Sequence, residues 1–186
     1  MSQRIYNYSA FYVAEPFNTS NLKAYATPDF CYYNILKAWK SEDSAFPFHD
    51  AHTTTYSVRD DSDWESTLKP RLHQRLNNSK NIILFLSSNT KHSRALNEEI
   101  AFGVGSLGLP VIVVYPECTD KEQIAEGGVI KQVIRNLWDN LPKFRDLMDS
   151  VPTIHVPMNK KLISMALEDS DLAIQTKKDN GRWFYQ

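Results

Sequence analysis

Two continuous apolar runs, separated by a segment of helix length, constrain the fold of this chain most. The first, KNIILFLSS, occupies residues 80–88, and the second, PVIVVY, occupies residues 110–115. Neither run alternates polar with apolar residues, so we interpret each as a strand buried on both faces, as in a parallel sheet. Residues 94–107 predict a helix between them, with Gly108 at its C-terminal end and Pro110 opening the next element. The two runs therefore predict a βαβ unit.

The segments before this unit continue the same alternation. Residues 4–13 are rich in aromatic side chains and predict a first strand. Residues 45–51 predict a short second strand, and the proline within it favours the edge of the sheet. Helices are predicted from Asp29 and over residues 62–79, where Pro70 should kink the second helix or divide it. Strands that alternate with helices predict a parallel sheet covered on both faces.

The remaining residues extend this pattern within one domain. The elements expected after residue 115 are helices over 121–140 and 141–150, a fifth strand over 152–157, a long helix over 160–178 and an aromatic tail over 181–186. The sequence therefore predicts a three-layer, flavodoxin-like α/β fold with a central, mainly parallel sheet of about five strands and a helical C-terminal extension. We expect residues 1–186 to form a single domain, with a core over 4–115 and the extension over 116–186.

Charge and composition exclude several classes of partner. The 21 basic and 22 acidic residues leave a net charge of −1, which gives no electrostatic reason to expect nucleic acid or an anionic membrane. No apolar stretch approaches the roughly 20 residues that a membrane span needs. The two cysteines have no disulfide or zinc spacing, and the N-terminus lacks the pattern of a signal peptide. We therefore expect a cytoplasmic protein that binds neither nucleic acid nor membrane.

Hydroxyl, aromatic and acidic residues follow the predicted strands. In open α/β sheets ligands bind at the carboxyl ends of the strands, so these side chains should gather at one edge, with a composition typical of a sugar or nucleotide pocket. The candidate substrate-binding residues are Ser9, Phe11, Tyr12, Asp50, His52 and Ser88. His49 and His52 flank Asp50 at a spacing that two metal ligands can have, but no further ligand cluster accompanies them, and we expect no metal.

Two adjacent carboxylates, Glu98 and Glu99, lie in the helix that follows the third strand. Neighbouring residues differ by about 100° around a helix, so only one of the two can face a pocket. Periodicity slightly favours Glu99, because it borders the apolar stripe of Leu96 and Ile100. The residues alone also fit a second interpretation, in which both glutamates are first-turn acids stabilised by the helix dipole by a few tenths of a kcal/mol each. The residues do not decide between these interpretations.

Four segments, in order, resemble a known family. They are NYSAFY, FHDAH with the following DWESTLKPRLHQRLNNS, NIILFLSSNT, and RALNEEI, in which a glutamate directly precedes an isoleucine. Together they resemble bacterial TIR-like domains, and in particular the ThsB family of Thoeris antiphage systems, over about residues 4–115. Three departures are Pro70 in the second helix, a long first loop, and the absence of the tryptophan often found just before the family's glutamate.

The resemblance implies an enzyme that consumes NAD as its substrate, with no separate cofactor. By position, Glu99 would be the catalytic glutamate of an NAD glycohydrolase or ADP-ribosyl cyclase that cleaves the nicotinamide–ribose bond. Ser9 and Phe11 would line the nicotinamide-ribose side, and Asp50 with the loop after it would close the pocket. The product would be a cyclic ADP-ribose-type signal that activates the effector ThsA in antiviral defence. Self-association or a phage-derived trigger would complete the active form.

Two other functions remain compatible with the sequence. A nucleoside 2-deoxyribosyltransferase-like enzyme shares a similar sheet, a catalytic glutamate and N-glycosidic chemistry, and incubation with NAD or with nucleosides separates the two. A non-catalytic TIR-like module that works by self-association is the alternative from another class. A phosphorylated receiver is disfavoured, because residues 9–11 and 87–89 lack the acidic residues that a receiver has after its first and third strands.

Overall fold

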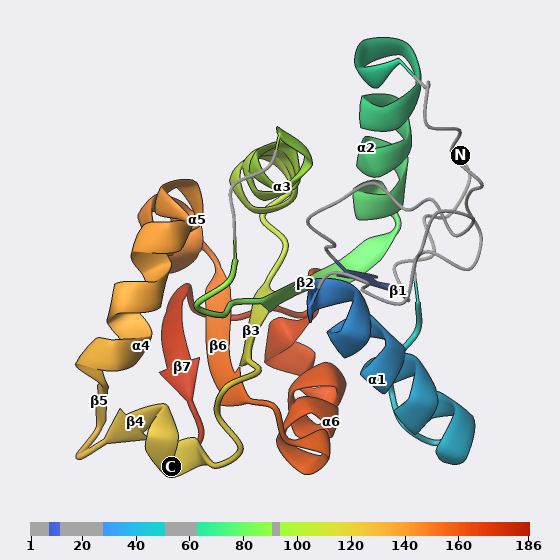
Figure 1. The fold of residues 1–186 in the computed structure, drawn as a ribbon. Coiled ribbons are helices and arrows are strands. Elements are labelled where there is room, and N and C mark those ends of the chain that lie inside the picture. The colour runs from blue at the N-terminus through green and yellow to red at the C-terminus, as the bar shows by residue number, and fades with distance from the viewer. Residues whose placement is uncertain (1–7, 12–27, 51–62, 91–93) are drawn as a thin grey trace.

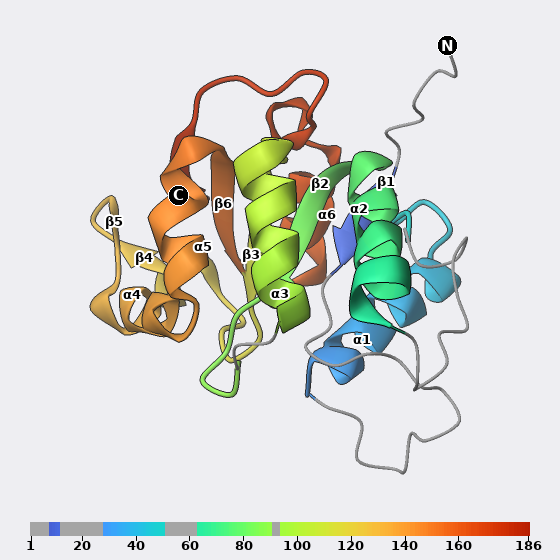
Figure 2. The same ribbon diagram turned by 90° about the horizontal axis from the view of Figure 1, so that it is seen from above.

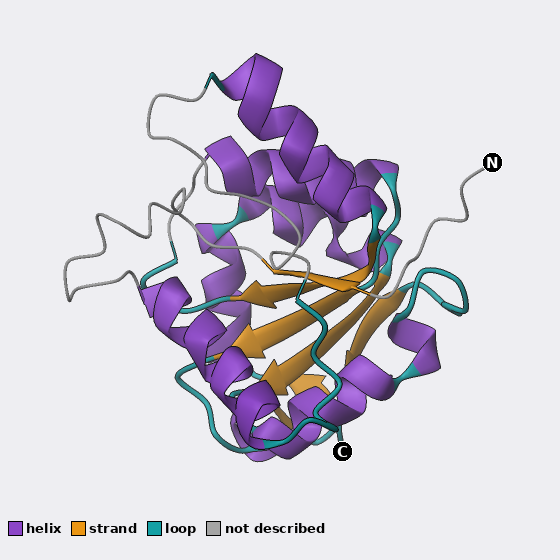
Figure 3. Cartoon of the chain, turned by 90° about the vertical axis from the view of Figure 1, so that its right-hand side faces the viewer, coloured by secondary structure: helices purple, strands orange, loops and turns teal. Residues whose placement is uncertain are grey.

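Five parallel strands form the central sheet of the protein (Figure 1). The structure is a computed structural model and describes residues 8–11, 28–50, 63–90 and 94–186. The strands, in their order across the sheet, are β1 (Tyr8–Phe11), β2 (Ser79–Phe85), β3 (Val111–Tyr115), β6 (Pro152–Pro157) and β7 (Gly181–Phe184). Each neighbouring pair is parallel, and Figure 3 shows them running in one direction between two layers of helices. The predicted α/β fold is confirmed.

The strand predicted over residues 45–51 forms a single bridge within its described part, residues 45–50. Asp50 pairs in parallel with Ser9, and the Ser9 N–H donates to the His49 carbonyl at 3.0 Å. Pro47 has no N–H to donate, which limits the ladder that this segment can form. The bridge lies beyond β1, so the predicted strands follow the spatial order 2-1-3-4-5 of flavodoxin-like folds.

Helices cover both faces of the sheet (Figure 2). Helices α1 (Pro28–Glu42) and α6 (Lys160–Glu168) cover one face, while α2 (Lys69–Asn77), α3 (Arg94–Glu99), α4 (Gln132–Leu137) and α5 (Pro142–Leu147) cover the other. None of the helices in the described ranges combines the length and the apolar character needed to cross a membrane.

Alternate residues of β2 belong to two separate hydrophobic cores, one on each face of the sheet. Ile82 and Leu84 pack with α2, α3 and α5, whereas Ile83 and Phe85 pack with α1 and α6. Strand residues point alternately to the two faces, so a strand covered by helices on both sides must be apolar throughout. The burial predicted from the run over residues 80–88 is confirmed.

Both helices that border the candidate site contain a π-helical segment. The first is η1 (Trp64–Leu68), which precedes α2; Asp63 caps it by accepting from the Ser66 N–H at 2.7 Å. The change from π to α geometry falls between Leu68 and Lys69, directly before Pro70, whose missing N–H removes one helical hydrogen bond in the first turn of α2. The second is η2 (Ile100–Ser106), which continues α3. The predicted break near Pro70 is therefore a change of helix type within one continuous helix.

Gly103 in η2 allows this helix to approach β2 closely. A Cβ atom at this position would lie 2.6 Å from Ile82 Cδ1 and 3.2 Å from Leu76 Cδ2. At the C-terminal end of η2, Gly108 adopts a φ of 65°. This is the left-handed conformation expected of a glycine after a helix. The glycines therefore set both the depth and the end of the helix that carries the adjacent glutamates.

The extension differs from its prediction in two places. Residues 121–140 do not form one helix. They contain, in order, η3 (Lys121–Gln123), strands β4 (Ala125–Glu126) and β5 (Val129–Ile130), α4, and η4 (Trp138–Asn140). Gly127 has a φ of 57° and Gly128 a φ of 80°. Such positive values suit a two-residue hairpin turn and interrupt a helix.

The long helix predicted over residues 160–178 is also wrong beyond Glu168. Asp169 is extended and caps the short helix η6 (Ser170–Leu172) by accepting from the Asp171 N–H. The predicted helix over 141–150 is confirmed as α5 followed by η5 (Met148–Ser150), and the fifth strand is confirmed as β6. The aromatic tail contributes the edge strand β7.

Candidate functional site

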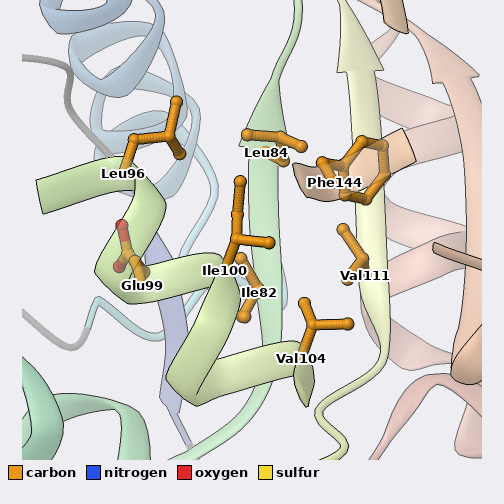
Figure 4. A pocket seen from close by; sticks show the side chains of 8 residues that line it. All are labelled: Ile82, Leu84, Leu96, Glu99, Ile100, Val104, Val111 and Phe144. Carbon is orange, nitrogen blue, oxygen red and sulfur yellow. The ribbon is translucent and has the colours of Figure 1, made fainter. Parts of the chain in front are cut away.

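Glu99 ends α3 with its carboxyl group turned into the molecule. Its side chain is 1% exposed and borders a cavity of about 10 Å³. A cavity of this size is at the lower limit for holding one water molecule. In Figure 4, helix and strand side chains converge on this cavity. The other residues that line it are Ile82, Leu84, Leu96, Ile100, Val104, Val111 and Phe144, all apolar. An ionisable group is thus held among hydrocarbon side chains.

One charged partner reaches Glu99 from the neighbouring helix. The Arg75 guanidinium on α2 donates through Nη2 to Glu99 Oε1 at 3.2 Å, and the Arg75 side chain is 16% exposed. The contact uses only one oxygen, because Glu99 Oε2 and Arg75 Nε are both buried and have no partner in the described part of the chain. The pair is therefore buried, charged and incompletely satisfied.

Burial dominates the protonation of Glu99. Removal of the carboxyl from water raises its pKa from the ordinary 4.5 to about 7, although the positive charge and hydrogen bond of Arg75 oppose this rise. Both the neutral and the ionised form of Glu99 are therefore populated near neutral pH. A pKa near the working pH is common among groups that act in catalysis.

Glu98 has a different environment on the same helix. Its Oε1 lies 2.7 Å from His73 Nε2 and 3.6 Å from Lys69 Nζ, and its side chain is 25% exposed. The His73 ring stacks on Phe102 with 3.6 Å between the ring centroids. Partial burial raises the pKa of Glu98, but the bond to His73 and the charge of Lys69 together outweigh it and lower that pKa below its ordinary value. Glu98 is therefore the member of the pair that stays ionised at neutral pH.

Ser9 lies on the opposite face of the sheet from Glu99. Its neighbour Ala10 belongs to the core beneath α2 and α3, so strand alternation directs Ser9 toward α1 and α6. The Ser9 hydroxyl is fully buried and has no partner in the described ranges. Asp50 lies beside it and accepts a 2.5 Å hydrogen bond from the Tyr33 hydroxyl of α1. Ser9 and Asp50 therefore lie together, with Ser9 directed to the face of the sheet opposite Glu99.

Ser88 forms a third group, at the carboxyl ends of β2 and β3. Its hydroxyl and its N–H both donate to the Glu117 carboxylate, the N–H at 3.2 Å. Phe11 lies in β1 with its side chain outside the described part of the chain, and Tyr12 and His52 fall wholly outside it. Among the described residues, Glu99 thus contacts Arg75, Asp50 contacts Tyr33, and Ser88 contacts Glu117. Within the described ranges, no three His, Cys, Asp or Glu side chains are grouped so as to hold a metal ion.

Arg75 was not identified from the sequence. It directly precedes Leu76 and follows Leu72 by three positions, so helical spacing places it at the border of the buried stripe. Glu99 has the same relation to Leu96 and Ile100. Two opposite charges that each border a buried stripe on successive helices are a recognisable signal, although their contact depends on how the helices pack.

The arrangement as a whole suits stabilisation of a developing positive charge. A carboxylate in apolar surroundings interacts strongly with nearby charge, because little water screens it. Comparison with known protein families finds a model, described as "Thoeris protein ThsB, TIR-like domain", that matches residues 8–121. The match begins at β1, includes both helices that carry the Arg75–Glu99 pair, and ends at the start of η3.

Proposed function

The chain belongs to the TIR-like family of the Thoeris protein ThsB, and we propose that it cleaves the nicotinamide–ribose bond of NAD with Glu99 as the catalytic carboxylate. The observation that carries this proposal is the environment of Glu99. Its carboxyl is 1% exposed, lined by apolar side chains, and bonded through only one oxygen to the described residues. Such a group is costly to keep buried, and a structural role alone does not require its second oxygen to remain unpaired.

The proposed reaction begins with heterolysis of the bond between ribose C1′ and the pyridinium nitrogen. The electron pair goes to nitrogen, so nicotinamide leaves as a neutral molecule and needs no general acid. Positive charge then develops on C1′ and the ribose ring oxygen, as in glycoside cleavage, and the Glu99 carboxylate stabilises it. Water adds to C1′ to give ADP-ribose, or a nucleophile of the same molecule adds to give a cyclic product; one proton is released in either case.

We further propose that capture within the same molecule prevails and yields a cyclic ADP-ribose-type signal for the effector ThsA. The apolar lining around Glu99 supports this choice, because exclusion of water disfavours hydrolysis of a reactive intermediate. The seven apolar side chains of the lining leave few sites at which a nucleophilic water could be held. The signal would couple this protein to its effector without direct contact.

The proposed reaction requires movement around Glu99. A cavity of about 10 Å³ admits no ribose, and the carboxyl is sealed from solvent in this conformation. Binding of NAD therefore involves a rearrangement that widens the cavity while Arg75 stays bonded to Glu99, which fits an enzyme that acts only after assembly or a trigger.

The test is mass spectrometry of small molecules after incubation of the protein with NAD, alone and with extract from phage-infected cells. We expect free nicotinamide in equal amount to an ADP-ribose-derived product in at least one condition, and none with Glu99→Gln. Cyclic and linear products differ by the mass of one water, so the same spectrum identifies the capture step.

Two controls test the alternative activity and the folding of the variant. Deoxynucleosides with a free base, supplied in place of NAD, test the deoxyribosyltransferase alternative by the exchange of bases. Circular dichroism of Glu99→Gln verifies that loss of product reflects chemistry and not unfolding. The proposal is wrong if folded Glu99→Gln releases nicotinamide at the wild-type rate.

A further inference from the structure

The contact between Arg75 and Glu99 is one-sided in a way that an ordinary ion pair is not. Arginine and a carboxylate commonly pair through two parallel hydrogen bonds, which would use Nε and Nη2 on one side and both oxygens on the other. Here only Nη2 and Oε1 bond, at 3.2 Å, while Nε and Oε2 are buried and find no partner among the described residues. The guanidinium therefore occupies one oxygen of the carboxylate and leaves the other available.

We propose that Arg75 is a positioning residue for the reaction: by holding Oε1 it orients the Glu99 carboxylate so that Oε2 meets the ribose carbon on which positive charge develops. This inference rests on the proposed function of Glu99. It assigns Arg75 no contact with the reacting atoms, and its role is exerted through Glu99 alone.

In the part of the chain that the structure describes, Arg75 is the one cation that faces Glu99 from the elements packed around it. Strands β2 and β3 and helix α5 contribute only apolar side chains to the cavity, and the nearest acid on the same helix, Glu98, is bonded to His73 and Lys69. Burial favours the neutral carboxyl, and the positive charge of Arg75 favours the ionised form. Arg75 therefore also sets how much of Glu99 is ionised, and hence able to stabilise a cation, at a given pH.

The two contributions of Arg75 can be separated by substitution. Lysine keeps a positive charge but presents it as a mobile point, without the planar fork that fixes one carboxylate oxygen. Methionine keeps much of the length of the side chain and removes both charge and fork. Arg94→Met is the matched control. Arg94 of α3 also pairs with a glutamate, Glu65 in the π-helical segment that precedes α2, but this pair lies at the surface.

The experiment measures kcat and KM for NAD from pH 5.5 to 9, under the conditions that give turnover with wild type. In parallel, the Glu99 carboxyl is titrated by carbon-13 NMR, with its signal assigned by its absence in Glu99→Gln. The acidic limb is the part of the pH profile in which kcat falls as the pH is lowered. For Arg75→Met we expect the pKa of Glu99 and the midpoint of this acidic limb to rise together by about one pH unit or more. We also expect kcat to fall about tenfold at pH 7 with KM changed less than twofold, and to recover in part at pH 9.

For Arg75→Lys we expect the acidic limb to stay near that of wild type while kcat falls at every pH, because charge is kept and orientation is lost. Arg94→Met should match wild type in both measurements. The inference is overturned if folded Arg75→Met keeps the wild-type kcat and acidic limb, or if its Glu99 titrates as in wild type. That outcome, with Glu99→Gln inactive, refutes the role of Arg75 alone; wild type that releases no nicotinamide under any condition refutes the proposed function instead.

If Arg75→Met does not fold, Arg75→Lys and Arg75→Gln provide the test. Arg75→Gln keeps a donor for Oε1 without its charge, so we expect an acidic limb moved up but kcat at pH 9 closer to wild type than in Arg75→Lys. Equal kcat values for the two variants at pH 9 would contradict an orienting role.

Discussion

Glu98 and Glu99 are adjacent in the sequence and occupy opposite kinds of environment. The surface along which α2 and α3 pack against each other is called the seam below. Glu98 lies at its outer edge, 25% exposed, with His73 and Lys69 as partners. Glu99 lies at the inner edge, 1% exposed, with Arg75 as its charged partner. The pKa of the first carboxyl is lowered, whereas burial raises that of the second to about 7. A rotation of about 100° around one helix separates a surface ion pair from a buried, partly protonated acid.

The comparison shows which property distinguishes a candidate catalytic acid from a structural one. Both glutamates have a basic partner from α2, so the presence of an ion pair does not separate them. Desolvation does, because it raises the energy of the charged form and leaves the carboxylate able to respond to charge that develops nearby. The predictions below test this difference, from the largest expected effect to the smallest.

The largest difference should be in turnover of NAD. We expect Glu99→Gln to lower kcat by about 10²-fold or more, the scale on which loss of one preorganised electrostatic group acts. Glu98→Gln should stay within about twofold of wild type, because its carboxylate points to the seam surface and its partners differ. Release of nicotinamide, followed by chromatography over time, measures both variants under identical conditions.

A reversal of this order would overturn the assignment of the two carboxylates. Equal loss in both variants would indicate that the seam as a whole, and not one carboxylate, supports turnover. Comparison of their unfolding curves at pH 7 excludes loss of folded protein as the cause.

The second difference concerns the pH dependence of stability. Glu99 titrates near 4.5 when unfolded and near 7 when folded. A raised pKa means that the folded state keeps its proton longer, so stability is full below pH 4.5 and falls as the pH rises toward 7. At about 1.4 kcal/mol per pKa unit, the expected loss is on the order of 3 kcal/mol. Glu99→Gln has no such titration.

The measurement is the free energy of unfolding in urea for wild type and Glu99→Gln from pH 4 to 8. The stability of wild type relative to the variant should decline with pH and level off above pH 7. For Glu98 we expect the opposite sign. The free energy of unfolding of wild type, relative to Glu98→Gln, should be highest above pH 4.5 and should fall as the pH drops through the lowered pKa of Glu98. Parallel curves for Glu98→Gln and Glu99→Gln would remove the distinction between the two carboxyls.

The sequence predicted most of the fold because its strongest signals are local. The runs over residues 80–88 and 110–115 became β2 and β3, since an uninterrupted apolar run has few alternatives to a doubly covered strand. The predictions were wrong where a proline or a pair of glycines interrupts a longer strand-like or helix-like pattern. Pro47 reduces the second strand to one bridge, and the glycine pair at 127–128 turns a hairpin inside an apparently helical stretch.

The candidate site was less accessible to sequence reasoning, because it depends on packing between elements. Proximity to Leu96 and Ile100 gave Glu99 a slight preference, which agrees with its burial. Its partner Arg75 lies 24 residues away on another helix, and no local pattern encodes that contact. The π-helical turns after Glu99 also change the helical angle on which face assignments depend, and the residues alone do not reveal them.

The third difference tests how tightly the inner side of the seam is packed. Gly103→Ala places a Cβ 2.6 Å from Ile82 Cδ1. Because overpacking of a core forces its neighbours to shift, we expect a loss of roughly 1–2 kcal/mol in the free energy of unfolding. Gly105 is the matched control, because a Cβ there meets only Leu147 Cδ1 at 3.6 Å, an ordinary contact. Gly105→Ala should be neutral or stabilising, since alanine favours helix over glycine.

Ile82→Val removes the methyl group that opposes the new Cβ of Gly103→Ala. The double variant should therefore be less destabilised than the sum of the two single variants, as measured by a double-mutant cycle in urea. Strict additivity would show that the cost at Gly103 comes from the backbone of η2 and not from its contact with β2.

The smallest effect should come from the outer side of the seam, where the Glu98 and His73 side chains lie 2.7 Å apart and are each about one-quarter exposed. A double-mutant cycle of Glu98→Gln with His73→Gln isolates this contact. For a pair so exposed we expect a coupling of about 0.5 kcal/mol at low salt. It should shrink at 1 M salt, where the screening length is about 3 Å. The Arg75–Glu99 pair is buried and should keep its coupling at high salt. Equal salt sensitivity of the two couplings would mean that water reaches both carboxylates, and the contrast between the inner and outer sides of the seam would not hold.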